Sequence, residues 1–212
     1  PGSAASYTEG GSAITLASGI TLADIDDANL TQAKVWISGG FTAGDTLSAN
    51  AGSTGITVSY ASATGILTLS HAGASKADFE SVLRTVTFSS TADDPTAISP
   101  SRSISWQVTD ADSSTGAANK LVSNLGTTQI DLTASDDGAS ISGLASAAFT
   151  ENGSPVAIAP TATLADSDDT TLSGLTVTIS SGLTSGDLLS VGANLVGTGI
   201  TVTPFDSGTG QL

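Results

Sequence analysis

The chain repeats itself, and this internal repeat constrains the fold more than any other feature of the sequence. Residues 7–12 (YTEGGS) match residues 149–154 (FTENGS), an offset of 142 positions. The Leu-Ala-Asp motif at 22–24 recurs at the same offset, and after a two-residue insertion residues 55–58 match 199–202. Ordered matches between several residue types indicate two copies of one structural unit.

The second copy is predicted to be incomplete, because Leu212 aligns with Leu67 of the first copy. The sequence therefore predicts three segments: a complete repeat in residues 1–135, a linker in 136–148 and a truncated repeat in 149–212. A sheet domain that lacks half of its strands leaves apolar faces and strand edges open. We therefore expect that the rest of the protein or a neighbouring chain covers Leu175, Val177 and Ile179.

The first copy reads as a succession of β-strands. Short runs alternate apolar and polar residues, which is typical of strands with one buried face: 13–16, 34–38, 55–60, 66–70, 85–88, 103–108 and 127–132. Alternation is clearest in 103–108, where Ile104, Trp106 and Val108 are predicted to face one side of a sheet. Gly, Ser, Thr and Ala dominate the composition, and Thr64-Gly65 is expected to form a hairpin turn.

One segment departs from this pattern. Ser75 and Asp78 have the spacing of a helix N-terminus, and Phe79, Val82 and Leu83 follow at helical spacing. The predicted fold is therefore all-β, with tandem antiparallel β-sandwiches and one short helix in the complete repeat.

Composition excludes several classes of function. The chain has 20 acidic and 5 basic residues, a formal charge of −15, which argues against binding to nucleic acid or to an anionic membrane surface. Cysteine is absent, so disulfides and thiolate metal sites are excluded. No apolar run approaches the roughly 18 residues that span a bilayer, so membrane insertion is not expected.

The acidic residues gather in a motif that both copies share. Asp24-x-Asp26-Asp27 recurs as Asp166-x-Asp168-Asp169, each time after a short apolar run. Crowded carboxylates repel unless a cation neutralises them, and ligand sets made only of oxygen suit hard cations, with Ca²⁺ the first candidate. Asp45 and Asp187 each lie in a Thr-x-Gly-Asp turn, where the carboxylate is expected to bond to nearby backbone.

The order of these motifs resembles the cadherin-like repeats of bacterial surface adhesins, including the calcium-binding RTX-like adhesins exported by type I secretion. Glu151-Asn152 resembles the pair that opens a cadherin repeat, and Asp166-x-Asp168 resembles the cadherin Asp-x-Asp. Thr64-Gly65 resembles the family's mid-repeat turn, Val108-Thr109-Asp110 a late strand end, and residues 130–137 the acidic linker.

This resemblance implies Greek-key sandwiches of the cadherin or immunoglobulin type and a secreted, cell-surface protein. Calcium would make neighbouring repeats of the same protein into a semi-rigid spacer for adhesion. The implied ligands are acidic side chains of both copies and of the linker: Glu9, Asp136, Asp137, Asp166 and Asp168 at the junction, and Asp24, Asp26 and Glu151 at equivalent sites. Asp110 is a further candidate, and its neighbour Asp112 and the Asp93-Asp94 turn are weaker ones. The second copy of the motif is favoured over the first, because Asp166 and Asp168 have a preceding repeat with which to share an ion.

The sequence also leaves three other functions to be considered. A glycan-binding module would use Trp36, which alternates with Val35 and Ile37 and is expected on the outer face. A filament or surface-layer subunit, assembled from copies of the chain, would have its second repeat completed by a neighbour. An enzyme is disfavoured: His71 is the only histidine, and no serine lies in a nucleophile-elbow motif.

Overall fold

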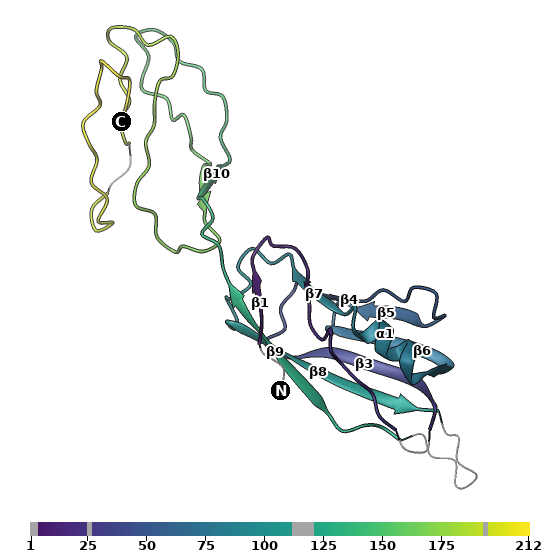
Figure 1. The fold of residues 1–212 in the computed structure, drawn as a ribbon. Coiled ribbons are helices and arrows are strands. Elements are labelled where there is room, and N and C mark those ends of the chain that lie inside the picture. The colour runs from purple at the N-terminus through teal and green to yellow at the C-terminus, as the bar shows by residue number, and fades with distance from the viewer. Residues whose placement is uncertain (1–3, 25–26, 112–120, 193–194) are drawn as a thin grey trace. The chain divides into compact units, whose positions relative to one another are not determined.

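The computed structural model describes residues 4–24, 27–111, 121–192 and 195–212 (Figure 1). The chain divides into two compact units, Pro1–Asp136 (unit 1) and Asp137–Leu212 (unit 2). Residues 137–148, which the sequence assigns to a linker, therefore belong to unit 2. No helix among the described residues is long and apolar enough to cross a membrane.

Unit 1 is built mostly of strands, in two sheets. The six-stranded sheet has the order β1-β9-β8-β3-β6-β5, and the three-stranded sheet the order β2-β7-β4. The elements are β1 (Ala5–Thr8), β2 (Ile14–Thr15), β3 (Asn29–Gly39), β4 (Asp45–Ser48), β5 (Thr57–Ala61), β6 (Ile66–Ser75), α1 (Lys76–Leu83), β7 (Thr87–Ser90), β8 (Ser101–Asp110) and β9 (Gly126–Thr133). The all-β class predicted from the alternating runs is confirmed at this level.

One pairing departs from the antiparallel arrangement that the sequence predicts. β1 runs parallel to β9, with Tyr7 opposite Leu132. Antiparallel pairing is favoured where a short turn joins two strands. β1 and β9 lie at opposite ends of the unit's sequence, so no turn sets their relative direction.

The predicted alternation decides which side chains enter the core. Val35 lies opposite Trp106 and Ile37 opposite Ile104, and all four side chains are buried. Tyr7 connects the two sheets: its hydroxyl donates to the Ser90 carbonyl at 2.9 Å, and its ring packs edge-on against Phe88. The core therefore lies between the two sheets and includes residues from both.

The short helix α1 begins where the sequence predicts. The Asp78 N–H donates to Ser75 Oγ at 3.1 Å, while the Ser75 hydroxyl donates to the Asp78 carboxylate at 2.6 Å. Phe79, Val82 and Leu83 are buried, and α1 lies against β3 and β6 (Figure 1). A helix of two turns is marginal by itself, so this packing holds it in place.

A buried ion pair lies at the start of β8. Arg102 Nε is 2.6 Å from Asp45 Oδ2, and both side chains are fully buried. Asp45 also accepts the Thr42 N–H at 2.9 Å, which is the turn role that the sequence predicts for it. Arg102 further donates to the Pro95 carbonyl at 2.8 Å, so its charge is well solvated by protein groups.

Unit 2 repeats the local geometry of unit 1. The Thr184 N–H donates to Asp187 Oδ2 at 2.8 Å, as the Thr42 N–H does to Asp45. Asn152 has a φ of 59°, close to the 66° of Gly10 at the equivalent position. Asn is among the few residues other than Gly that tolerate this left-handed conformation.

Regular structure in unit 2 is sparse. β10 (Ser140–Ser142) pairs antiparallel with β11 (Thr163–Ala165), and Thr178 bridges to Gln211. Leu175 is exposed, and Val177 and Ile179 are only half-buried. The expected cover over these side chains is therefore not provided by any part of the chain that the structure describes.

Candidate metal centre

Three aspartates of unit 1 bring their carboxylates together. Asp24 and Asp27 lie in the segment that leads into β3, and Asp110 is the last residue of β8. Each offers a carboxylate oxygen, and these oxygens all lie within 4.8 Å of one another. We call this group the aspartate cluster.

Backbone bonds hold the cluster in place. The Asp27 N–H donates to Asp24 Oδ1 at 2.9 Å, which connects these two aspartates directly. Asp110 lies opposite Leu30, beside a β-bulge at Thr31 whose hydroxyl donates to the Asp110 carbonyl at 2.7 Å. The bulge thus fixes the end of β8 against the start of β3.

Burial makes the cluster electrostatically costly. Asp27 and Asp110 are only 7% and 6% exposed. Carboxylates withdrawn from water remain charged only where cations or hydrogen-bond donors compensate them. Asp110 Oδ1 accepts the Leu121 N–H at 2.8 Å, and Lys76 Nζ donates to the Asp24 carbonyl at 2.7 Å. Three carboxylates remain close together, which is the arrangement that a hard divalent cation neutralises.

Sequence reasoning identified two of these three residues. Asp24 and Asp110 were predicted ligands, and the structure brings them together although 86 positions separate them in the sequence. Asp27 was not among the predicted ligands, although it is the third carboxylate of the repeated motif. The predicted ligand Asp26 and the weaker candidate Asp112 lie outside the described residues.

The second copy of the motif repeats this hydrogen bond. Asp166 Oδ1 accepts the N–H groups of Asp168 at 3.1 Å and Asp169 at 2.9 Å. Asp168 Oδ2 accepts the Asp137 N–H at 2.7 Å. Asp168 Oδ1 is buried and has no hydrogen-bond partner among the described residues, and a buried carboxylate oxygen of this kind is suited to bind a cation. Backbone N–H groups therefore connect Asp137, Asp166 and Asp168 within unit 2.

The other predicted ligands, Glu9, Asp136 and Glu151, are not members of the aspartate cluster. Glu9, in unit 1, accepts the Ser135 N–H at 2.9 Å. Asp136 and Glu151 are exposed. The junction site inferred from the resemblance draws on both units, so it stays a prediction.

Asp94 has a structural role instead. The hydroxyl and N–H groups of Thr96 both donate to Asp94 Oδ1 at 2.7 Å. These hydrogen bonds stabilise the charged form and lower the pKa of Asp94. Such an acid stabilises a turn without any metal.

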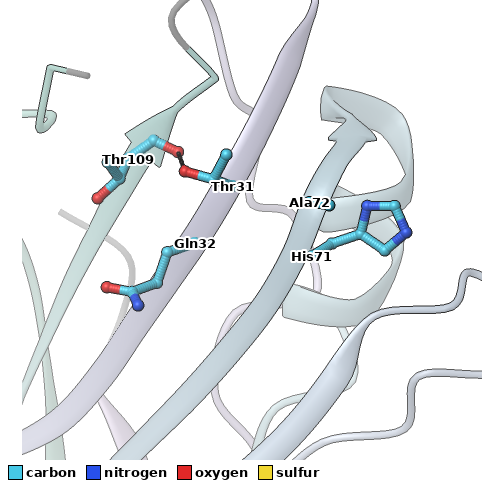
Figure 2. Close-up of a pocket in the computed structure, with 5 residues that line it drawn as sticks. All are labelled: Thr31, Gln32, His71, Ala72 and Thr109. Atoms are coloured by element: carbon cyan, nitrogen blue, oxygen red, sulfur yellow. Dashed lines mark hydrogen bonds between the residues drawn. The ribbon is translucent and has the colours of Figure 1, made fainter. Parts of the chain in front are cut away.

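A surface pocket lies across three neighbouring strands of the six-stranded sheet (Figure 2). Thr31 and Gln32 come from β3, His71 and Ala72 from β6, and Thr109 from β8. The His71 ring points away from the β3 side chains (Figure 2), and its Nδ1 accepts the Gly73 N–H at 3.0 Å. Among the described residues, no carboxylate or serine hydroxyl hydrogen-bonds to His71, so the pocket lacks the partners of a catalytic histidine.

Trp36 is half-buried on the face of β3 opposite Val35 and Ile37, as its alternation with them predicts. It lies opposite Ser105 on β8 and Ile66 on β6. This environment by itself indicates no ligand, because sheets commonly carry single aromatic side chains on their outer face.

Comparison with known proteins found no match: no protein-family model, no curated protein and no solved structure matches the chain.

Proposed function

We propose that this chain is an extracellular spacer or adhesion repeat whose units are stabilised and made rigid by calcium. The observation that carries the proposal is the aspartate cluster, in which Asp27 and Asp110 are nearly buried and share one small volume with Asp24. Three carboxylates that share one small volume repel one another, and a bound cation removes this repulsion.

The chemistry of the cluster favours Ca²⁺ over transition metals. Its donors are all carboxylate oxygens, and the chain has no cysteine and a single histidine. Oxygens on opposite sides of a calcium ion are about 5 Å apart, since each lies about 2.3–2.6 Å from the ion. The carboxylate oxygens of the cluster all lie within 4.8 Å of one another, which is close enough for one ion to contact all three. Backbone carbonyls and water would complete the six to eight ligands.

A bound ion would join two segments that are distant in sequence. It would attach Asp24 and Asp27 to the end of β8, beside the bulge at Thr31. A ligand that binds only the folded state stabilises it by about 2.7 kcal/mol when its concentration is a hundredfold above the dissociation constant. Affinities of roughly 10⁻⁴ to 10⁻³ M suffice for extracellular modules.

We further propose that unit 1 is a Greek-key sandwich of the cadherin or immunoglobulin type, and that neighbouring repeats are its partners. The two sheets with a common core support this proposal, as does the recurrence of the acidic turn in unit 2. The orphaned Asp168 Oδ1 supports a second cation position near Asp166.

Calcium titration of matched variants tests the proposal. We expect isothermal titration calorimetry to detect Ca²⁺ binding, and thermal unfolding to occur at a higher midpoint in Ca²⁺ than in chelator. Asp27→Asn and Asp110→Asn should each abolish the calcium-dependent shift of unit 1. Asp131→Asn is the control, because Asp131 is an exposed acid on β9 outside the cluster.

Two results would contradict the assignment. An unfolding midpoint that is the same in Ca²⁺ and in chelator would remove calcium as a stabilising ligand. A shift that survives Asp27→Asn and Asp110→Asn but disappears in Asp166→Asn would move the site to unit 2. Small-angle scattering tests the spacer role: Ca²⁺ should narrow the distribution of end-to-end distances.

A further inference from the structure

β3 has a neighbouring strand on each side. Val35 pairs with Leu67 of β6 on one side and with Trp106 of β8 on the other. At the repeat offset of 142, residues 171–181 of unit 2 are the counterpart of β3. The neighbours of this segment can therefore be compared directly with those of β3.

The counterpart in unit 2 has a neighbour on the β6 side. Val177 and Leu212 exchange two backbone hydrogen bonds of 3.1 and 3.0 Å, and the Ile179 N–H donates to the Gly210 carbonyl at 2.9 Å. The equivalent bond in unit 1 runs from the Ile37 N–H to Gly65.

The other side of this segment is open. Successive residues of a strand direct their backbone groups to opposite sides. The N–H and C=O groups of Thr176, Thr178 and Ser180 therefore face the side that β8 occupies in unit 1. No described residue provides a hydrogen-bond partner for these groups.

Unit 2 also keeps the apolar side chains that a completed core would bury. Phe149 is 66% exposed, whereas its counterpart Tyr7 is 2% exposed. Ile200 is 62% exposed, whereas its counterpart Ile56 is 4% exposed. Exposed apolar side chains on this scale mark a surface that binds another polypeptide segment.

A carboxylate at the same position in both units indicates one residue that this segment should carry. In unit 1, Asp45 accepts the backbone of its own turn and pairs with Arg102 at the start of β8. Asp187 makes the same turn bond in unit 2, but the described residues include no ion pair to it. A segment that completes unit 2 in the manner of β8 would bring an arginine to this carboxylate.

We propose that unit 2 is an acceptor for a β-strand with the chemistry of β8. The incoming strand lies antiparallel to residues 172–180 and pairs with the backbone of Thr176, Thr178 and Ser180. Apolar side chains at alternate positions pack on Leu175, Val177 and Ile179. An arginine two positions before the first of these apolar side chains pairs with Asp187. The pattern is that of β8: Arg102, Ile104, Trp106 and Val108.

A peptide from the chain itself tests this proposal. A synthetic peptide with the sequence of residues 99–110 would be added to the full-length chain in chelator, and hydrogen exchange measured by mass spectrometry. We expect slower exchange over residues 172–180 and saturable binding by calorimetry. A peptide of equal composition, in which Ile104 is exchanged with Ser105 and Trp106 with Gln107, should not bind, because its apolar side chains face the wrong side.

The arginine is tested separately. Asp187→Asn in the full-length chain should weaken binding of the native peptide by about tenfold, the effect of about 1.4 kcal/mol. Asp169→Asn removes the same charge elsewhere in unit 2 and should leave the affinity unchanged.

The proposal is overturned if the native peptide leaves exchange at 172–180 unchanged, or if the rearranged peptide binds equally well. Equal affinity in Asp187→Asn would overturn the arginine pairing. Protection of 172–180 that appears without peptide and rises with protein concentration, together with dimers in sedimentation, would also overturn it, because a second copy of the chain would then be the occupant.

Discussion

The aspartates of this chain serve at least two roles, and the difference lies in where each carboxylate points. Asp45, Asp94 and Asp187 accept hydrogen bonds from backbone N–H groups in their own turns. Asp27 and Asp110 converge from different elements on one buried volume. Residue type and local spacing are alike in the two groups. The tertiary contact made by Asp110 distinguishes the aspartate cluster, the calcium site that we propose, from an acid that only stabilises its own turn.

The buried pair of Arg102 and Asp45 should dominate the effect of substitutions in unit 1. We expect Arg102→Met to destabilise the protein by about 3–5 kcal/mol, because it leaves the Asp45 carboxylate buried without its partner. Urea unfolding measures this loss. The double variant Arg102→Met with Asp45→Leu should recover part of it, since neither charge then remains buried. A loss below about 1 kcal/mol for Arg102→Met, the value typical of surface pairs, would contradict the burial of this pair.

Tyr60 should make the stability of unit 1 depend on pH in the alkaline range. Burial and the nearby charge of Asp45 raise the pKa of Tyr60 above its ordinary value of 10.0. The unfolded chain therefore loses this proton at lower pH than the folded chain does. The stabilisation is fully present below pH 10 and is lost as pH rises through the folded pKa. Tyr60→Phe should remove this part of the alkaline loss in urea unfolding curves.

The raised pKa of Tyr60 can also be measured directly, from the tyrosinate absorbance of the folded protein. The difference between titrations of the wild type and Tyr60→Phe isolates Tyr60, and its midpoint should lie above 10. A midpoint at or below 10 would show that the hydroxyl is not shielded as the structure describes.

At the scale of elements, the strands and the start of the helix could be predicted from the sequence, because the alternation of apolar and polar residues and the helix cap each depend on residues close together in the chain. The register of Val35 with Trp106 follows once each strand has one apolar face. The parallel pairing of β1 with β9 could not be predicted, since it joins segments more than a hundred residues apart with no connecting turn. Arg102 was likewise missed as the partner of Asp45, because 57 positions separate them.

The start of α1 gives a quantitative prediction for one element. Ser75→Ala removes the side chain that accepts the Asp78 N–H, and should cost about 0.5–2 kcal/mol of the unfolding free energy. Ser81→Ala is the matched control, because Ser81 is exposed in the same helix and does not cap it. Its effect should stay within about 0.5 kcal/mol. Equal losses in the two variants would mean that the cap does not stabilise α1.

At the scale of the whole molecule, the repeat was the most informative part of the sequence. It predicted equivalent positions, and the same hydrogen bonds recur at them, such as those to Asp24 and Asp166. It could not predict which side chains come together in space, because that depends on strands from distant parts of the sequence. The aspartate cluster illustrates this dependence: in unit 1 Asp24 and Asp27 are joined by a third carboxylate from β8, which lies far along the chain.

This difference between the units predicts a difference in local stability. In unit 1, Val35, Leu67 and Ile104 lie in a continuous ladder between buried faces, so their amides should exchange only on global unfolding of the unit. In unit 2, measurable protection should be confined to short pairings, such as β10 with β11 and Val177 with Leu212. Hydrogen exchange followed by mass spectrometry on the full chain compares the two directly.

The two units should differ in local stability because they balance apolar burial against chain entropy differently. Each ordered residue costs on the order of 1–2 kcal/mol of backbone entropy, and burial of apolar area is the main term that offsets it. Unit 2 leaves Phe149, Leu175 and Ile200 exposed, so it offsets less of this cost per residue than unit 1 does. Slow exchange throughout unit 2 in the isolated monomer would contradict this balance. If unit 2 lacks only the burial of these side chains, its amides should exchange slowly when the β8 peptide is bound and rapidly when it is not.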